Sequence, residues 1–150
     1  MTTLTTSTRV TAFQFVVWSV PVAQPRQRHT IFAGHVKSYT PTKAPVNVFK
    51  AAVQMALQEN HGNNPPLDGP LHLAVEFFLP RPKSLIWKSR PMPQLPHATR
   101  PDIDNLLKSV MDAMKGMAWR DDTQVSEVVA SKYICGGDDR PHVRIFIREA

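Results

Sequence analysis

Two aspartates stand one residue apart near the start of the stretch RPDIDNLLKSVMDAMKG, residues 100–116. They are Asp102 and Asp104, and Lys108 follows the second of them by four residues. Carboxylate oxygens suit Mg²⁺, which keeps several waters and binds through few protein groups and a substrate phosphate. Such an ion activates water, and a lysine one helical turn away adds positive charge at the reacting phosphate. These residue types at this spacing therefore fit metal-assisted hydrolysis of a phosphodiester.

A second acidic pair, Asp121 and Asp122, follows this segment and directly precedes a stretch with the pattern of a strand. We expect the chain to bring a carboxylate from the start of the helix and one from the start of the strand to the same place. The same residues also have a structural interpretation. Asp104 can cap the helix and form an exposed ladder of i,i+4 pairs with Lys108 and Asp112, while the second pair forms a turn. The spacing alone leaves both interpretations open.

The distribution of charge favours the metal. Residues 1–101 carry eleven lysines and arginines against three acidic residues, and residues 102–150 carry seven against nine, which gives a net charge of +6. A basic surface of this kind indicates a polyanionic partner such as nucleic acid. A carboxylate cluster beside that surface would repel phosphates unless a cation lay between them.

A long basic loop is predicted at residues 80–101, which hold six prolines, five lysines or arginines and no acidic residue. Residues 21–45 form a second basic stretch that is rich in loops. From these two stretches come the side chains that we expect to contact DNA, which are Arg26, Arg28, Lys37, Lys43, Arg81, Lys83, Lys88 and Arg90.

The elements that must position these residues follow from periodicity. Apolar residues at helical spacing predict helices at residues 47–60 and 103–115, and alternating or continuous apolar residues predict strands. The strands are expected at 10–20, 71–80, 124–134 and 142–149, with a short hairpin around Gly34. The length suits one domain with a hydrophobic core, so residues 1–150 are read as a single α+β domain with a mixed or antiparallel sheet.

Several other classes of protein are disfavoured. No apolar run approaches 18 residues, so no membrane span is expected. Residues 13–23 are apolar but interrupted by Ser19 and Pro21, which favours a strand over a signal peptide. Cys135 is the single cysteine, so no internal disulfide can form, as suits a reducing cytoplasm. The six histidines show no metal-ligand spacing.

The stretch RPDIDNLLKSVMDAMKGMAWRDDTQV resembles the signature of RusA-type Holliday-junction resolvases, the crossover-junction endodeoxyribonucleases of bacteria and their prophages. The matching features are D-x-D-N, a lysine four residues after the second aspartate, and a tryptophan followed by Asp-Asp and Gln-Val. The motifs YTP (39–41) and FFLPRPKS (77–84) are also similar to that family. The resemblance covers nearly the whole chain and implies one RusA-like domain with two main helices that forms a dimer.

The resemblance also implies roles for individual residues. Asp102, Asp104 and Asp122 are similar to the catalytic metal-binding carboxylates of the family, and Lys108 to its essential lysine. Asp121 is expected to support these carboxylates from outside the metal's ligands. The implied cofactor is Mg²⁺, with Mn²⁺ as a substitute, and water is the nucleophile, leaving a 5′-phosphate and a 3′-hydroxyl.

These expectations describe a bacterial or phage-encoded cytoplasmic enzyme of DNA recombination and repair that acts on four-way junctions as a homodimer. Two symmetric nicks suit a two-fold axis, and we expect the interface on the outer face of the helix at residues 47–60 or on an edge strand. Two alternatives stay open. One is a non-catalytic module that binds branched DNA, and the other is a metal nuclease for flaps or forks.

Overall fold

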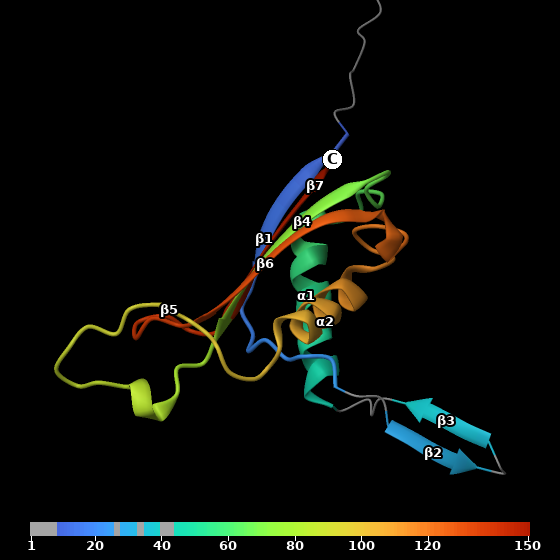
Figure 1. Ribbon diagram of the computed structural model, residues 1–150. Coiled ribbons are helices and arrows are strands. Elements are labelled where there is room, and N and C mark those ends of the chain that lie inside the picture. Colours follow the sequence, from blue (N-terminus) through green and yellow to red (C-terminus); the bar gives the residue numbers. More distant parts are fainter. Residues whose placement is uncertain (1–8, 26–27, 33–34, 40–43) are drawn as a thin grey trace, which may run out of the picture.

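One mixed sheet of five strands forms the centre of the protein (Figure 1). A computed structural model describes residues 9–25, 28–32, 35–39 and 44–150. The order across the sheet is β1-β7-β4-β6-β5. β4 and β6 are parallel, whereas the other neighbours are antiparallel. The strands are β1 (Ala12–Val17), β7 (His142–Glu149), β4 (Leu71–Leu79), β6 (Val125–Ile134) and β5 (Leu95–Pro96). The expected α+β class and mixed sheet are confirmed.

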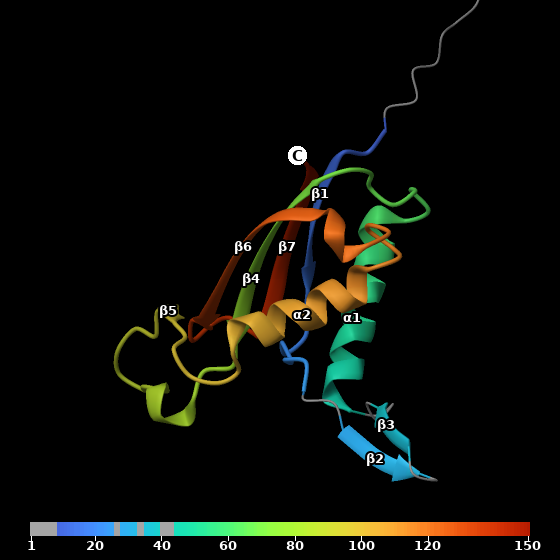
Figure 2. The ribbon, with the colours of Figure 1, turned by 45° about the vertical axis from the view of Figure 1, so that its right-hand side comes forward.

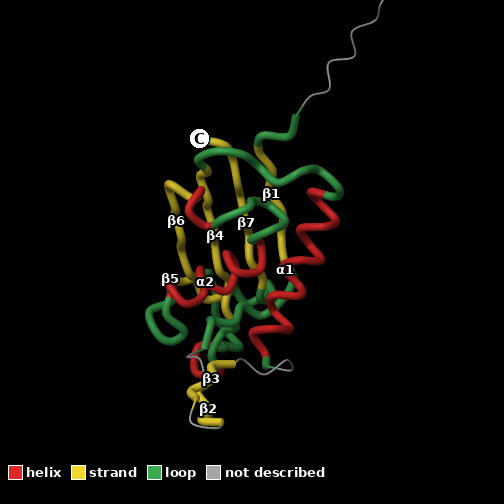
Figure 3. Tube along the Cα trace, turned by 90° about the vertical axis from the view of Figure 1, so that its right-hand side faces the viewer, coloured by secondary structure: helices red, strands yellow, loops and turns green. Residues whose placement is uncertain are grey.

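Two helices cover one face of this sheet, as Figures 2 and 3 show. They are α1 (Pro45–His61) and α2 (Ile103–Met114). The core lies between them and the sheet, where alternate residues of β4, such as Leu73 and Phe77, are fully buried. The stripe of α2 contributes Leu106 and Val110 to the same core. Burying each such side chain is worth roughly 1.5–3 kcal/mol, so this apolar stripe fixes which face of α2 points outward.

Both helices begin and end at residues that suit their termini. Pro45 occupies the first turn of α1, where its missing N–H costs nothing, and Gly62 follows the last residue with a φ of 61°. The N-cap of α2 is Asp102, and Gly116, with a φ of 86°, lies just beyond its end as the sequence predicts. None of the helices among the described residues is long and apolar enough to cross a membrane.

The basic stretches contain more regular structure than the sequence predicts. Within residues 80–101 the chain forms a short 3₁₀ helix, η1 (Lys83–Leu85), and then the edge strand β5. A second two-stranded sheet consists of β2 (Arg28–Phe32) and β3 (His35–Tyr39), which confirms the expected hairpin, although Gly34 lies outside the described residues. In Figures 1 and 2 the hairpin and the basic loop both lie at the end of the molecule opposite the C-terminus.

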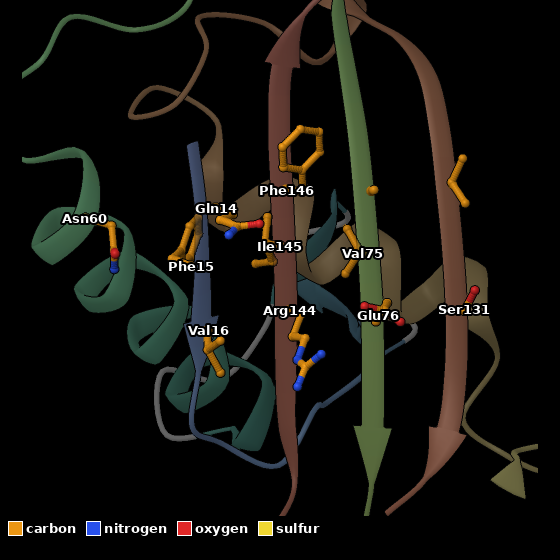
Figure 4. Close-up of a pocket in the computed structure, with 12 residues that line it drawn as sticks. Gln14, Phe15, Val16, Asn60, Val75, Glu76, Ser131, Arg144, Ile145 and Phe146 are labelled. Carbon is orange, nitrogen blue, oxygen red and sulfur yellow. The ribbon is translucent and has the colours of Figure 1, made fainter. Parts of the chain in front are cut away.

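No helix of the described residues covers the other face of the main sheet. Figure 4 shows a hollow on this face, with a volume of about 720 Å³. Glu76 of β4 and Arg144 of β7 are paired positions in its floor, beside Phe146. At the end of the sheet near the basic loop, the ring of Phe78 lies between those of His142 (4.1 Å) and Tyr133 (5.4 Å).

Candidate functional site

The first turn of α2 presents two carboxylates to solvent. Asp102 is the N-cap residue, and its side chain makes no capping hydrogen bond, although its carbonyl accepts from the N–H of Leu106 (3.1 Å). Asp104 follows in the first turn and its Oδ1 accepts from the N–H of Asn105 (2.9 Å). Neither carboxylate forms an ion pair with any described residue. Both therefore keep oxygens available for a ligand, at a helix terminus whose dipole favours negative charge.

The segment that leads into this turn is fastened to strand β6. The Nζ of Lys132 donates to the carbonyls of Thr99 (2.5 Å) and Pro101 (2.7 Å). The N–H of His97 donates in turn to the carbonyl of Lys132 (3.1 Å). Partial burial, together with the positive charge of Lys132, lowers the pKa of His97, so this imidazole is neutral at pH 7. The chain thus reaches Asp102 from a fixed starting point.

A second contact holds the other side of the turn. The chain after β1 runs past α2, where the N–H of Gln24 donates to the carbonyl of Asn105 (2.9 Å). One turn further, the hydroxyl of Ser109 donates to the carbonyl of Val22 (2.8 Å). The Lys132 contacts hold residues just before α2, and these bonds hold residues within it. The start of α2 is therefore hydrogen-bonded to the rest of the fold at two places.

Lys108 is exposed on α2 and forms no ion pair within the described part of the chain. Asp112, its i+4 neighbour, pairs instead with Lys50 of α1 (3.7 Å). The ladder of i,i+4 pairs that the structural interpretation of the sequence required is therefore not formed. The ammonium group of Lys108 is free to meet an anion near Asp104.

Asp121 and Asp122, the second acidic pair, lie in different environments. Asp121 stabilises a turn through its side chain. It caps a 3₁₀ helix, η2 (Asp122–Gln124), where its Oδ1 accepts from the N–H of Thr123 (3.0 Å). The side chain of Gln124 accepts from the N–H of Asp121 (3.1 Å), which completes a capping box. Hydrogen bonds from Thr123 lower the pKa of Asp121. One oxygen of its carboxylate therefore stabilises the turn.

Asp122 is half-buried, and its Oδ1 accepts from the indole N–H of Trp119 (2.8 Å). Trp119 is completely buried, so it fixes the orientation of this carboxylate. Gln124 also donates to the carbonyls of Leu67 (3.0 Å) and Gly69 (3.1 Å), which anchors the turn to the start of β4. Sequence reasoning noted this tryptophan and glutamine as parts of a pattern but missed what they do.

The structure does not bring Asp122 together with Asp102 and Asp104 within one chain. Asp122 begins η2, which leads directly into β6, whereas Lys132, which holds the Asp102 segment, lies seven residues beyond the first residue of that strand. Seven residues of strand span roughly 23 Å, and the twelve residues of α2 that separate the two ends span roughly 18 Å. Accordingly, no group of three or more His, Cys, Asp or Glu side chains among the described residues could hold a metal ion.

The pair at the start of α2 nevertheless suits a divalent cation. Asp102 and Asp104 are exposed carboxylates that lack cationic partners in the described structure, and their oxygens are hard ligands. Mg²⁺ needs only one or two carboxylates when waters and a substrate phosphate complete its octahedron. The donor set present in one chain therefore fits Mg²⁺ through these two residues.

The basic residues near this end of the molecule have different roles. Arg81 is half-buried and donates to the carbonyls of Leu85 (2.6 Å), Pro93 (2.7 Å) and Cys135 (3.2 Å), so it holds the loop together. Its guanidinium also lies 4.9 Å from the ring of Trp87. The exposed basic side chains of the loop are Lys83, Lys88, Arg90 and Arg100, of which Arg90 stacks on Trp87 at 3.8 Å.

The basic residues of the hairpin are placed less fully. Arg28 begins β2 and Lys37 lies within β3, while Arg26 and Lys43 lie outside the described residues. In Figure 2 this hairpin lies at the same end of the molecule as the basic loop. Both basic stretches are thus on the side of the molecule from which α2 begins.

Comparison with known proteins gives two matches. The model of the family described as endodeoxyribonuclease RusA matches residues 19–148. The uncharacterized protein YqaN of Bacillus subtilis (strain 168) is 32% identical over 141 residues, which cover 91% of this chain and 95% of that relative. The matched residues include both acidic pairs, Lys108 and the basic loop.

Proposed function

Because the chain belongs to the RusA endodeoxyribonuclease family, we propose that it is a Mg²⁺-dependent, structure-selective endonuclease that resolves Holliday junctions by paired symmetric nicks. One observation carries this proposal. The exposed carboxylates of Asp102 and Asp104 form no ion pair with any described residue, and the exposed Lys108 follows Asp104 by one helical turn, at the end of the fold that carries the basic loop. The proposed setting is recombination and repair in the cytoplasm of a bacterium or of a phage-infected cell.

The residues of the chain would divide the reaction between them. Asp102 and Asp104 would hold Mg²⁺ (or Mn²⁺) against the scissile phosphate, and Lys108 would place its ammonium beside the oxygens that gain charge. When bound, the ion supplies activation of water and neutralises phosphate charge. Lys83, Lys88 and Arg90 would position the duplex arms through the phosphate backbone without reading sequence.

Asp122 needs a second copy of the chain to act at the same phosphodiester, since one chain holds it far from Asp102. A four-way junction has two equivalent strands to cut, and a two-fold dimer matches that symmetry. We propose that the homodimer brings Asp122 of one copy toward the first turn of α2 in the other. Trp119 would then orient this carboxylate within its own chain, while Gln124 holds the turn that carries it.

The experiment that tests this function uses end-labelled four-way junction, flap and linear duplex, each incubated with the protein and Mg²⁺, Mn²⁺ or EDTA. We expect paired nicks at symmetric positions of the junction, with either metal and not with EDTA. Junction binding with no cleavage in any metal would identify a non-catalytic module for branched DNA. Faster cleavage of flaps than of junctions would identify a metal nuclease for another branched substrate.

A further inference from the structure

We propose that Lys132 is a positioning residue for the metal-binding carboxylates, because it fastens the segment that carries Asp102 to the end of β6. Its Nζ donates to the carbonyls of Thr99 (2.5 Å) and Pro101 (2.7 Å), the two residues on either side of Arg100. The second of these carbonyls belongs to the residue directly before Asp102. The catalytic part of this inference rests on the function proposed above, whereas the fastening itself does not.

The position of Lys132 in its strand is unusual for a charged residue. Lys132 is paired in register with Phe77 of β4, which is fully buried. Paired residues of neighbouring strands point to the same face, so Lys132 points to the face that the helices cover. Its alternate neighbour Ile134 on this face is also buried. Lys132 is itself half-buried, so hydrogen bonds to protein groups offset the partial loss of water around its ammonium group.

The partners that it has are carbonyl groups and not carboxylates. Among the described residues, Lys132 forms no ion pair, so its charge-assisted hydrogen bonds go to Thr99 and Pro101. A lysine that served only to offset the charge of Asp102 would pair with that carboxylate directly. The geometry instead ties down the backbone before Asp102 and leaves the carboxylate itself available.

Further hydrogen bonds connect the segment held by Lys132 to α2 on one side and to the sheet on the other. The carbonyl of Asp102 accepts from the N–H of Leu106, which is the first hydrogen bond of α2. The carbonyl of Lys132 accepts from the N–H of His97, next to β5. Residues 97–102 are therefore held at both ends through one lysine. Misplacing a catalytic group by about 1 Å can cost a factor of about 100 in rate, so this hold would matter for cleavage.

The first measurement is hydrogen–deuterium exchange on the full-length protein without metal or DNA. In Lys132→Met, we expect amides between residues 98 and 106, including that of Leu106, to exchange at least about 10-fold faster than in the wild type, whereas the N–H of His97 keeps its bond to the main-chain carbonyl of residue 132. Amides of β4 should keep their wild-type rates. Lys132→Arg keeps the charge and the donors and should recover most of the protection. Lys50→Met is the matched control, because it removes the same charge from α1 and leaves residues 97–106 protected.

The second measurement separates positioning from contact with DNA. We expect Lys132→Met to weaken the binding of Mn²⁺, measured by titration calorimetry, at least about 5-fold, while the junction is bound in EDTA within about 2-fold of wild type. Unchanged exchange at residues 98–106 would overturn the inference. So would faster exchange throughout β4, which would show a general loss of stability, or a shallower salt dependence of junction binding, which would show a phosphate contact. The exchange experiment stands even if the wild-type protein cuts no junction.

Discussion

Asp102 and Asp104 differ from Asp121 in what their oxygens already bind. The carboxylate of Asp121 caps η2, whereas Asp102 has no side-chain capping bond and Asp104, within the described part of the chain, accepts from the next backbone N–H alone. The sequence alone does not distinguish a carboxylate that stabilises a turn from one that is available to bind a cation. Their hydrogen bonds separate them and lead to opposite predictions for the same substitution.

Replacing Asp102 or Asp104 by Asn should lower the single-turnover rate of junction cleavage by about 100-fold or more, because a neutral amide is a poor ligand for Mg²⁺. Junction binding in EDTA should persist or tighten, since a negative charge facing phosphate has been removed. Asp112→Asn is the matched control, because Asp112 lies on the same helix and its ion pair among the described residues is with Lys50. Near wild-type rates in both Asn variants would show that these carboxylates are not the metal site.

Replacing Asp121 should act on stability and not on chemistry. The pKa of Asp121 is lowered in the folded state, so its contribution is present above the unfolded value of about 3.9 and is lost as the pH falls through the folded value. We expect Asp121→Asn to lower the melting temperature at pH 7, and we expect its difference from the wild type to shrink as the pH falls below the unfolded value. Cleavage per folded molecule should change less than 10-fold. Loss of cleavage with an unchanged melting temperature would instead assign Asp121 to the reaction.

Lys108→Ala should slow single-turnover cleavage by about 100-fold, which is a typical cost for removing a group that stabilises charge in the transition state. Its side chain is exposed and unpaired among the described residues, so thermal stability should hardly change. Lys115→Ala offers a control at the other end of α2, where an exposed lysine follows the last turn. A lower melting temperature with normal cleavage per folded molecule would give Lys108 a structural role.

At the scale of the elements, hydrogen bonds and ring contacts hold the basic loop of residues 80–101, called the arm below, in one conformation. Arg81, at the start of the loop, bonds the carbonyls of Leu85 and Pro93 within it and that of Cys135 after β6. Trp87 lies against two guanidinium groups. The residues that hold the arm and the residues that face solvent can therefore be tested separately.

Replacing Lys83 and Lys88 together by Ala should make the slope of log K against log salt shallower by about 0.9 for each phosphate that the variant no longer neutralises. Affinity should fall by the same factor for junctions of different sequence, because backbone contacts carry no sequence information. Arg81→Ala should instead loosen the arm and speed tryptic cleavage after Lys83 and Lys88. A wild-type slope in the double variant would exclude Lys83 and Lys88 from the DNA interface.

Periodicity predicted the helices and long strands because the burial of a face imposes it on the sequence, as in the alternation of β7 and the stripe of α2. It could not predict that β4 and β6 run parallel, since alternation defines faces and not neighbours. Likewise the carboxylates were visible as residue types. The sequence did not reveal the distance from Asp102 to Asp122, because that distance depends on how α2 lies along β6. The sequence gives only a weak sign of the role of Lys132, which is a charged residue at a position that alternates with apolar ones.

At the scale of the whole molecule, the separation of Asp122 from Asp102 makes the dimer testable by complementation. We expect Asp102→Asn and Asp122→Asn to be inactive alone. Mixed, they should form heterodimers with one intact site if each site draws on both chains, and about a quarter of the sites should recover. The recovered activity should nick one strand without resolving the junction. No recovery, in a mixture shown to exchange subunits, would place the two carboxylates in separate functions.

The surface offers apolar side chains for such an interface. Val48 and Met55 on the outer face of α1 are about two-thirds exposed, and Trp18 lies exposed just beyond β1, at the edge of the sheet. A stable dimer should bury roughly 1,000 Å² or more. Sedimentation should therefore give twice the 16.9 kDa of the chain at micromolar concentration, and Val48→Glu should shift it toward the monomer. A wild-type monomer that binds one junction at a time would require two sequential visits.

The hydrogen bond between Trp119 and Asp122 also makes the protein its own optical probe. An indole buried away from water emits at short wavelength, and its emission depends on the charge at its N–H. Once Trp18 and Trp87 are replaced by Phe, Trp119 is the one remaining fluorophore of its kind in the chain. Its emission would then change whenever a cation or a DNA strand reaches Asp122. A stopped-flow experiment could thus time the step at which a cation or a DNA strand reaches Asp122.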